Sequence, residues 1–487
     1  MVEKVSPLPE KETAQEIKKS LNYSIKDGSF WSIMQGFGES YLSAFAVFLK
    51  ATSFELAMVV ALPQLLSAVF QLAAVKLTTV FKSRKTIVGI FTFLQAVTWL
   101  VIIGLTYVFN SVWLLILLSS IYFLLNAMAA PAWTSWMGDL VPVDIRGRYF
   151  GRRNRITGFI NFASVSIAGI ILDRLSAINT LYGFFLLFFI AFLGRLVSWY
   201  YLMLQFEPRV ELREPKGEGF FKFLKELNTT NFGIFTSYVM LIYFSVYLAS
   251  PLFVIFWLSY LKFTYLQYTV LIATSAIVTF VTMTYWGGYA DKYGNRTVLW
   301  VCGNFIGLIP LITFFSWYMP KALQFPAAIL VQIISGFGWA GFNLSSSNFL
   351  YDAVAPEHRV RYFSYMSSLK GIFLFMGGLI GGILADIEFN GWFKAIIPSG
   401  ILLVMLMSFF LRTILSTFYI GKIKDVKITE EHKPKLLFFV TIMPLQGLMF
   451  DTVVGLNRTL KQFRKQINRI EGKLDYLEED YRKKTNQ

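Results

Sequence analysis

Long apolar runs separated by short polar connections dominate the chain. Their cores lie at residues 28–49, 54–78, 86–108, 112–138, 156–177, 180–205, 232–258, 265–288, 297–318, 324–350, 366–385 and 393–416. Each run is close to the length of a transmembrane helix, which needs about 20 mostly apolar residues. The runs are too long and continuous for the strands of a membrane barrel, which are about ten residues of alternating pattern. The pattern therefore predicts an all-α integral membrane protein with twelve transmembrane helices.

The basic residues of the connections alternate between the two ends of the predicted spans. One set of connections carries basic clusters within residues 82–85, 146–155, 209–225, 292–296 and 359–361. The other set carries little beyond Lys50, Arg174, Lys262, Lys321 and Lys394. Because cytoplasmic loops are enriched in Lys and Arg, this asymmetry predicts a multi-pass protein of the cell membrane with both termini in the cytoplasm.

The longest internal polar stretch divides the predicted spans into two groups of six. We therefore expect a cytoplasmic N-terminal segment at 1–27, a six-helix bundle at 28–206, a cytoplasmic linker at 207–230, a second six-helix bundle at 231–418 and a cytoplasmic tail at 419–487. The first segment is polar and lysine-rich and has no short apolar stretch before a small-residue cleavage site. We expect no removable signal peptide there.

The composition agrees with a membrane location. Of the 487 residues, 55% are hydrophobic and 15% are charged, whereas roughly a quarter of a soluble domain is charged. The net charge of +16 would by itself suit binding to nucleic acid. The positive charges lie between apolar runs, however, as they do in a protein oriented by a bilayer. We expect the lipid bilayer as a partner, and no nucleic acid.

A short charged phrase occurs twice. "DLVPVDIRGRYF" begins at Asp139, and "DAVAPEHRVRYF" begins 213 residues later at Asp352. Each copy ends the fourth span of its half and leads into the fifth. The matching pairs are Asp139/Asp352, Val141/Val354, Arg146/Arg359, Arg148/Arg361, Tyr149/Tyr362 and Phe150/Phe363. Two parallel six-helix halves are the sequence signature of one large transporter architecture.

With this repeat the chain resembles the major facilitator superfamily. A second motif carries the resemblance: "GGYADKYGNRTVL", after the eighth span, is similar to the family's G-x-x-x-D-(R/K)-x-G-x-(R/K) loop. The positions that fill it are Gly287, Asp291, Lys292, Gly294 and Arg296. The equivalent loop after the second span, "AVKLTTVFKSRK", keeps its basic residues but has no acid. The resemblance implies secondary active transport of a small solute by alternating access, and symport is one form that this takes.

The acids of these motifs are candidate gating groups. An acid at the end of a helix is poorly placed for the helix dipole and needs a cationic partner, which the next loop supplies in both halves. The resemblance implies that Asp291 meets the start of the fifth span from the other half, near residues 151–155. The expected gating set is Asp139, Arg146, Arg148, Gly287, Asp291, Arg296, Asp352, Arg359 and Arg361. For Arg152, Arg153 and Arg155 we expect a solvated connector.

Polar side chains spaced three or four residues apart share a face of a helix, and such stripes occur on the first, fourth, seventh and tenth spans. In the resembled family these spans line the central cavity. Together with polar residues of the second and sixth spans, the candidate binding residues are Gln35, Glu39, Gln64, Asn126, Trp133, Arg195, Tyr243, Tyr247, Trp339 and Asn343. The competing interpretation is that these polar side chains hold helices together.

Glu39 is the most informative single residue, because an ionisable group in the middle of a span is costly and is functional by default. At 1.5 Å per residue, Glu39 lies roughly 20 Å from Lys26 and Arg195 roughly 18 Å from Glu207, so the two are at a similar depth. Two interpretations stay open. Glu39 and Arg195 form a structural ion pair, or Glu39 binds a proton or a cationic group of the substrate.

The sequence contains apparent nucleotide-binding motifs, but their context argues against such sites. "GFGWAG" at 336–341 matches G-x-G-x-x-G but lies inside a span and follows no strand, so we expect close helix packing rather than a nucleotide site. The doubled G-x-x-x-G of "GGLIGG" at 377–382 is interpreted the same way. The sequence has no P-loop, and His358 and His432 are far apart. We expect no metal, no cofactor and no enzymatic activity.

The tail ends in a heptad pattern at residues 456–487, typical of a coiled coil. It predicts either an amphipathic helix folded on the membrane or on the protein's own loops, or self-association through a coiled coil. Two alternative functions follow from the tail and from the aromatic-rich chain: a transporter-like receptor or scaffold, and a lipid translocator.

Overall fold

The computed structural model describes residues 10–81, 83–142, 145–208, 220–354, 359–390 and 397–425. For residues 10–14, 71–81, 106–107, 146–148 and 359–361 the description is confined to the backbone. The predicted heptad helix at 456–487 lies outside these ranges. Throughout the described part of the chain the regular structure is helical.

The first half forms one bundle. Its helices are α1 (Glu10–Phe37), η1 (Glu39–Tyr41), α2 (Leu42–Phe48), α3 (Ser53–Phe81), α4 (Arg84–Phe109), α5 (Val112–Leu140) and α6 (Arg146–Met203). The first predicted span is a broken helix, since α1 ends before Glu39 and α2 begins after Tyr41. The long α6 holds the fifth and sixth predicted spans, which meet at Asn179, whose φ of −158° and ψ of 110° are not helical.

The second half repeats this arrangement. Its helices are α8 (Asn231–Ala249), α9 (Leu252–Ile255), η2 (Phe256–Tyr260), α10 (Tyr265–Tyr293), α11 (Asn295–Ser316), α12 (Lys321–Ala353), α13 (Arg359–Ala385), α15 (Gly400–Thr417) and η4 (Tyr419–Lys422). The predicted linker contains a short helix, α7 (Phe220–Glu226), in which Phe223 is buried. The seventh span breaks at Pro251, close to the position that corresponds to the break of the first span.

The prediction of twelve spans is confirmed. Ten helical stretches of the described chain are long and apolar enough to cross a membrane. One of them, Tyr149–Met203, holds two spans joined at Asn179. The first span, formed by α1, η1 and α2, completes the twelve.

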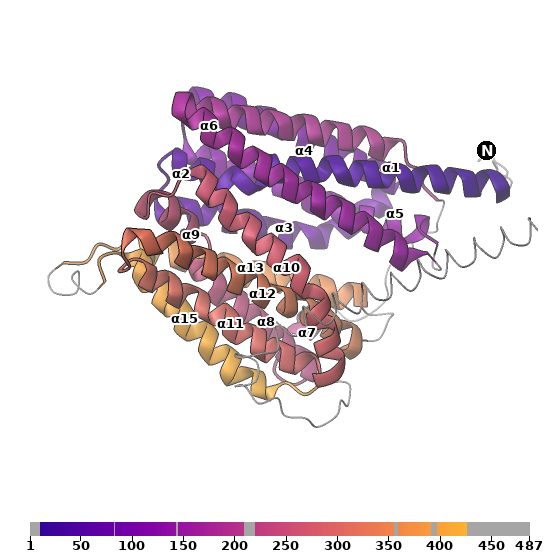
Figure 1. The fold of residues 1–487 in the computed structure, drawn as a ribbon. Coiled ribbons are helices and arrows are strands. Elements are labelled where there is room, and N and C mark those ends of the chain that lie inside the picture. The colour runs from indigo at the N-terminus through magenta and orange to yellow at the C-terminus, as the bar shows by residue number, and fades with distance from the viewer. Residues whose placement is uncertain are drawn as a thin grey trace, which may run out of the picture.

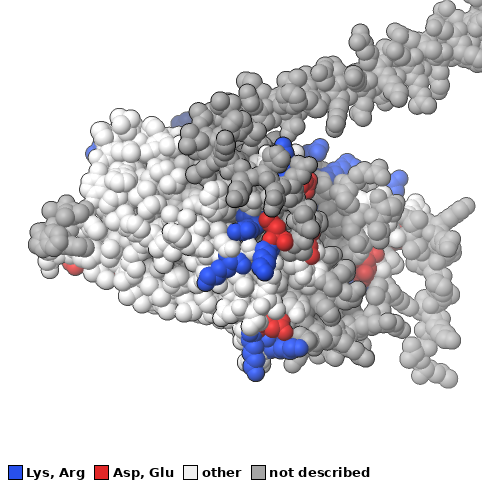
Figure 2. All heavy atoms as spheres, turned by 90° about the horizontal axis from the view of Figure 1, so that it is seen from below, with Lys and Arg blue, Asp and Glu red and all other residues white. Residues whose placement is uncertain are grey.

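The spans form two bundles that lie against each other along one face (Figure 1). At one end of the bundles, here called the basic end, α3, α5 and α15 finish and α4, α6, α11 and α13 begin. Charged side chains gather toward this end, and most of the remaining face visible in Figure 2 is uncharged. A broad uncharged surface suits contact with lipid tails. The other end of the spans is called the opposite end.

One contact between the bundles runs from the opposite end to the middle of α3 and α13. At the opposite end, both carboxylate oxygens of Asp386 accept hydrogen bonds, from the backbone N–H groups of Ser53 and Phe54, each 3.0 Å long. Further along, small residues bring the two helices together. A Cβ at Gly378 would lie 2.6 Å from the Cβ of Ala61, and one at Gly371 would lie 2.3 Å from the Cβ of Ala68.

The doubled glycine motif of α13 packs on two neighbours at once. Gly378 and Gly382 face α3 of the other bundle. Gly377 and Gly381 face α8, where a Cβ on Gly381 would lie 2.0 Å from the carbonyl oxygen of Leu248. The expectation of close helix packing for residues 377–382 is therefore confirmed.

The second contact between the bundles joins α6 to α10 and is confined to the opposite end. Tyr41 donates a hydrogen bond to the carbonyl of Val165 at 2.8 Å, and its hydroxyl lies 2.8 Å from that of Thr269. Asp173 accepts from the backbone N–H of Leu266 at 3.2 Å. Toward the basic end α6 and α10 are not packed against each other at their glycines. A Cβ added at Gly151, Gly158 or Gly288 would meet no atom within 4 Å. The bundles are thus closed at the opposite end and apart at the basic end of these helices.

Gly381→Ala should lower the free energy of unfolding by about 1–3 kcal/mol, because the added methyl group overpacks the α8–α13 contact. Gly104→Ala is the matched control, since a Cβ there meets nothing within 4 Å and alanine is the better helix former. Thermal unfolding in detergent measures both. Equal stability of the two variants would contradict the packing role.

Candidate functional site

Glu39 lies at the break in the first span. The break occurs where Gly38 adopts φ −101° and ψ −77°, and a Cβ at this glycine would clash with the ring of Trp99 at 2.5 Å. Glu39 then accepts two hydrogen bonds, from the hydroxyl of Tyr122 at 2.6 Å and from the amide of Gln35 at 3.3 Å. The structure thus brings together two of the predicted binding residues with a tyrosine of the fourth-span polar stripe.

Of the two interpretations of Glu39 that the sequence left open, the ion pair with Arg195 is not formed in the structure. The ion pairs of the described residues do not include it. Arg195 instead donates from Nε to Gln95 at 2.6 Å and from Nη1 to Ser198 at 3.2 Å. Ser198 in turn donates to Asp27 at 2.6 Å. The guanidinium is turned toward the basic end because this second buried acid lies there.

Sequence reasoning missed Asp27 because it assigned residues 1–27 to a cytoplasmic segment. In the structure α1 already begins at Glu10, and Asp27 is only 3% exposed. One signal in the sequence could have identified Asp27. It is an acid among lysines, at a position that continues the helical register of the first span. Arg153 also differs from expectation: it is 9% exposed and lies 3.9 Å from Asp27, whereas Arg152 and Arg155 are exposed as expected.

These charges border a cavity of about 290 Å³ inside the first bundle. Its lining includes the predicted binding residues Asn126, Trp133 and Arg195 together with Asp27 and Arg153. The guanidinium of Arg153 lies over the ring of Trp133 at 4.9 Å from the ring centre, which is within cation–π range. The cavity therefore offers an acid, two guanidinium groups and an aromatic wall to a small polar molecule.

A second cluster unites predicted binding residues of the seventh and tenth spans. Tyr243 donates to the side-chain oxygen of Asn343 at 3.3 Å, and its ring centre is 5.5 Å from that of Trp339. Lys370 of α13 places its ammonium group 4.7 Å from the centre of the Tyr243 ring. Sequence reasoning missed Lys370, although it is a lysine within an apolar run.

The two remaining predicted binding residues lie apart from these clusters. Tyr247 is one turn beyond Tyr243 on α8 and packs, half-buried, against the hydrophobic core. Gln64 is at the contact between the bundles, where its backbone carbonyl oxygen would lie 3.0 Å from a Cβ at Gly371. The structure thus gives Gln64 a neighbour in the packing of α3 on α13.

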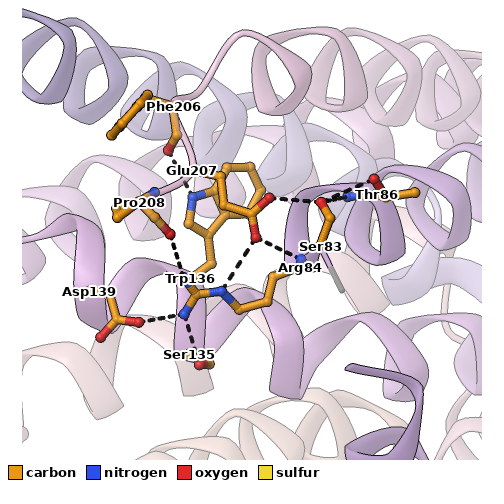
Figure 3. A network of polar contacts seen from close by, with 9 residues as sticks. All are labelled: Ser83, Arg84, Thr86, Ser135, Trp136, Asp139, Phe206, Glu207 and Pro208. Atoms are coloured by element: carbon orange, nitrogen blue, oxygen red, sulfur yellow. Dashed lines mark hydrogen bonds and ion pairs between the residues drawn. The ribbon is translucent and has the colours of Figure 1, made fainter. Parts of the chain in front are cut away.

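The gating acid Asp139 pairs with an arginine from the preceding loop. Arg84, at the start of α4, bonds through Nη1 to Asp139, through Nη1 to Ser135 at 3.1 Å and through Nη2 to the carbonyl of Pro208 at 3.1 Å (Figure 3). Glu207 accepts from the backbone N–H of Arg84 at 2.7 Å and from Ser83 at 2.8 Å. Three parts of the first bundle are joined by one arginine that is 2% exposed.

The second bundle contains a related network at the equivalent place. Asp352 accepts from the amide of Asn295 at 3.1 Å, as Asp139 accepts from Arg84. Asp425 accepts from the backbone N–H of Arg296 at 3.0 Å, as Glu207 accepts from that of Arg84. In both halves an acid that follows the last span caps the first turn of the third span, where the helix dipole favours negative charge. The similarity between the halves therefore extends to two further acids, and the described partner of the repeated aspartate is an arginine in the first bundle and an asparagine in the second.

The remaining members of the gating set are placed as follows. Gly287 has room around it, with a Cβ meeting only Leu344 at 3.8 Å. Asp291 is exposed, and Gly151 at the start of α6 has no neighbour for a Cβ within 4 Å. The expected contact between Asp291 and the fifth span is not formed in this conformation. For Arg146, Arg148, Arg359 and Arg361 the side chains lie outside the described part of the chain.

Glu207→Gln should lower the free energy of unfolding by about 1.5–3 kcal/mol, because it replaces a charged acceptor at the start of α4 by a neutral one. Asp425→Asn, the equivalent change in the second bundle, should cost less, since Asp425 is exposed. Thermal unfolding in detergent compares the two variants. A larger loss for Asp425→Asn would contradict the central position of Arg84.

Comparisons with known proteins agree with this architecture. The tetracycline resistance protein, class H, of Pasteurella multocida is 29% identical over 150 residues, which are 30% of this chain and 35% of that relative, so the match spans about a third of the relative's length. The crystal structure of a mutant of the nucleoside transporter NupG superposes with a TM-score of 0.66 at 16% identity, covering 83% of this chain and 100% of the other. The POT family transporter PepTSo gives a TM-score of 0.67 at 10% identity, covering 83% and 97% of the two chains.

These low identities establish the shared fold alone. The family model described as Major Facilitator Superfamily matches residues 28–255 and 235–437, and so covers the twelve spans of both bundles. Together with the internal repeat and the arrangement of the helices, this match leads to one conclusion: the chain belongs to the major facilitator superfamily.

Proposed function

We propose that this protein is a secondary active transporter that moves a small solute across the cell membrane by alternating access, with Glu39 as its proton-binding group. The family and the fold support transport. The solutes named for the similar proteins differ, so these likenesses do not select one for this chain. The observation that carries the proposal is Glu39 itself, an acid at a helix break in the middle of a bundle.

The surroundings of Glu39 suit a group that gains and loses a proton. Tyr122 and Gln35 both donate to the carboxylate, so the charged form is held by hydrogen bonds. Within the described residues no cation lies within 4 Å of it, so protonation breaks no ion pair. Broken helices in the membrane are typical of transporter binding sites. A solute that competes for Tyr122 or Gln35 would change the affinity of Glu39 for its proton.

The two ends of the molecule support alternating access. If both termini are cytoplasmic, as the basic loops predict, then the end at which α6 and α10 part is the cytoplasmic one. The structure then corresponds to an inward-open state. In the outward-open state α6 and α10 approach at the basic end, which brings Asp291 toward the start of α6 and its exposed arginines.

Glu39→Gln should abolish the dependence of uptake on a pH gradient, because the amide cannot bind the coupled proton. A thermal-shift screen of metabolites on the purified protein first supplies a solute, and uptake into proteoliposomes with and without an inward proton gradient is then measured. Glu55→Gln is the control, since this half-buried acid lies at the start of α3, where it accepts from the backbone N–H of Thr52 at 3.0 Å. Gradient-driven uptake by Glu39→Gln at the rate of the unmodified protein would exclude the proton role.

Asp291→Asn should shift the population toward the inward-open state, because it removes a charge that stabilises the closed cytoplasmic side. Asp173→Asn should act the other way, since Asp173 holds α6 to α10 at the opposite end. A cysteine at Gly158, in a Cys302→Ser background, reports the opening through its labelling by a hydrophilic maleimide. Identical labelling in both variants, with full transport, would rule out the gating role of these acids.

A further inference from the structure

The second bundle contains a cavity that none of the roles above uses. Its volume is about 200 Å³. The polar side chains that line it are Ser250, Gln332, Ser335 and Arg412, and the aromatic ones are Phe253, Trp257 and Trp339. The cavity therefore combines one charged group with an apolar, largely aromatic wall.

Arg412 of α15 is the charged group, and it is 1% exposed. Its Nη1 donates to the carbonyl of Ile306 at 3.0 Å, and its Nη2 donates to that of Val246 at 3.1 Å. The Ile306 carbonyl is available because its usual helical partner, four residues on, is Pro310, which has no N–H group. Two neutral carbonyls thus hold the guanidinium in place.

The charge of Arg412 is not balanced by the described part of the protein. Its Nε–H group has no hydrogen-bond partner, and no described ion pair includes it. A guanidinium does not lose its proton in proteins, and a buried charge without a counter-charge is strongly destabilising. An anion in the adjoining cavity would remove this cost.

The first bundle shows what the second one lacks. Arg195 lies on the sixth span, one helical turn before the place that corresponds to Arg412, and there Asp27 supplies a negative charge through Ser198. The shift of 213 residues that aligns the two halves puts Met240 at the position of Asp27. Each half thus has a buried arginine in its last span, and the position of the acid in the first half holds an apolar residue in the second.

We infer that the cavity beside Arg412 binds a small organic anion, whose carboxylate accepts the Nε–H of Arg412 and whose apolar part packs against Trp257 and Trp339. The hydroxyl of Ser335 and the amide of Gln332 line the same space and supply donors for the second carboxylate oxygen. The inference concerns binding, and it holds whether or not the anion is the transported solute.

Benzoate is a suitable probe, because it joins one carboxylate to an aromatic ring. Titration of the purified full-length protein should quench tryptophan fluorescence with a saturable curve, and calorimetry should give the same affinity. Benzamide has the same shape without the charge and should bind at least tenfold more weakly. Chloride should not compete at equal concentration.

Variants separate a binding role of Arg412 from a structural one. Ser335→Leu fills the cavity without touching the bonds of Arg412, so it should abolish benzoate binding while the protein still unfolds at its usual temperature. Arg412→Lys keeps a positive charge but removes the Nε–H group, and it should weaken benzoate at least tenfold. Arg174→Gln, at an exposed arginine, is the control and should leave the affinity unchanged.

Three results would overturn the inference. They are equal binding of benzoate and benzamide, binding of chloride in place of benzoate, and benzoate binding that survives both Ser335→Leu and Arg412→Lys. Since the readout is binding, these results are independent of the proteoliposome experiment. Loss of transport with intact benzoate binding would contradict the proposed function and not this site.

Discussion

The cost of burying charge is the constraint on which this structure depends. Inside a helix bundle surrounded by lipid, a charged side chain needs a partner from the protein or from a ligand. Arg84 finds two acids, Arg195 reaches one through a serine, and Glu39 is held by a tyrosine and an amide. Each of these arrangements joins helices that are distant in sequence, so the polar contacts also determine how the helices of a bundle are packed.

The same constraint explains which features of the structure could be predicted from the sequence. The length and continuity of the apolar runs were enough to predict twelve spans and two halves, because span length is set by the bilayer. Glu39 was recognisable as a charge within such a run. Asp27 was not, because the polar sequence before it hid the fact that α1 extends far beyond the membrane-length core.

Partners of charged groups were the least predictable feature. Arg84 reaches Asp139 and Glu207 across 55 and 123 residues of sequence, and no local pattern connects them. Comparison of the two repeated halves helps to identify some of these partners. Once Asp139 and Asp352 are aligned, the first turns of the third and ninth spans can be compared, and in each an acid that follows the last span of its half accepts from the backbone. Two differences then stand out: Asn295 instead of Arg84 donates to the repeated aspartate, and Met240 stands at the position of Asp27.

The glycines of α13 have a mechanical consequence. Because they leave a strip of each contact face without side chains between Gly371 and Gly382, α13 meets α3 and α8 there through smooth backbone surfaces rather than interlocked ridges. Two smooth helices can slide and turn against each other without separating, whereas interdigitated ones must first disengage. The α3–α13 contact can therefore serve as the pivot that stays in place while α6 and α10 part at one end and meet at the other.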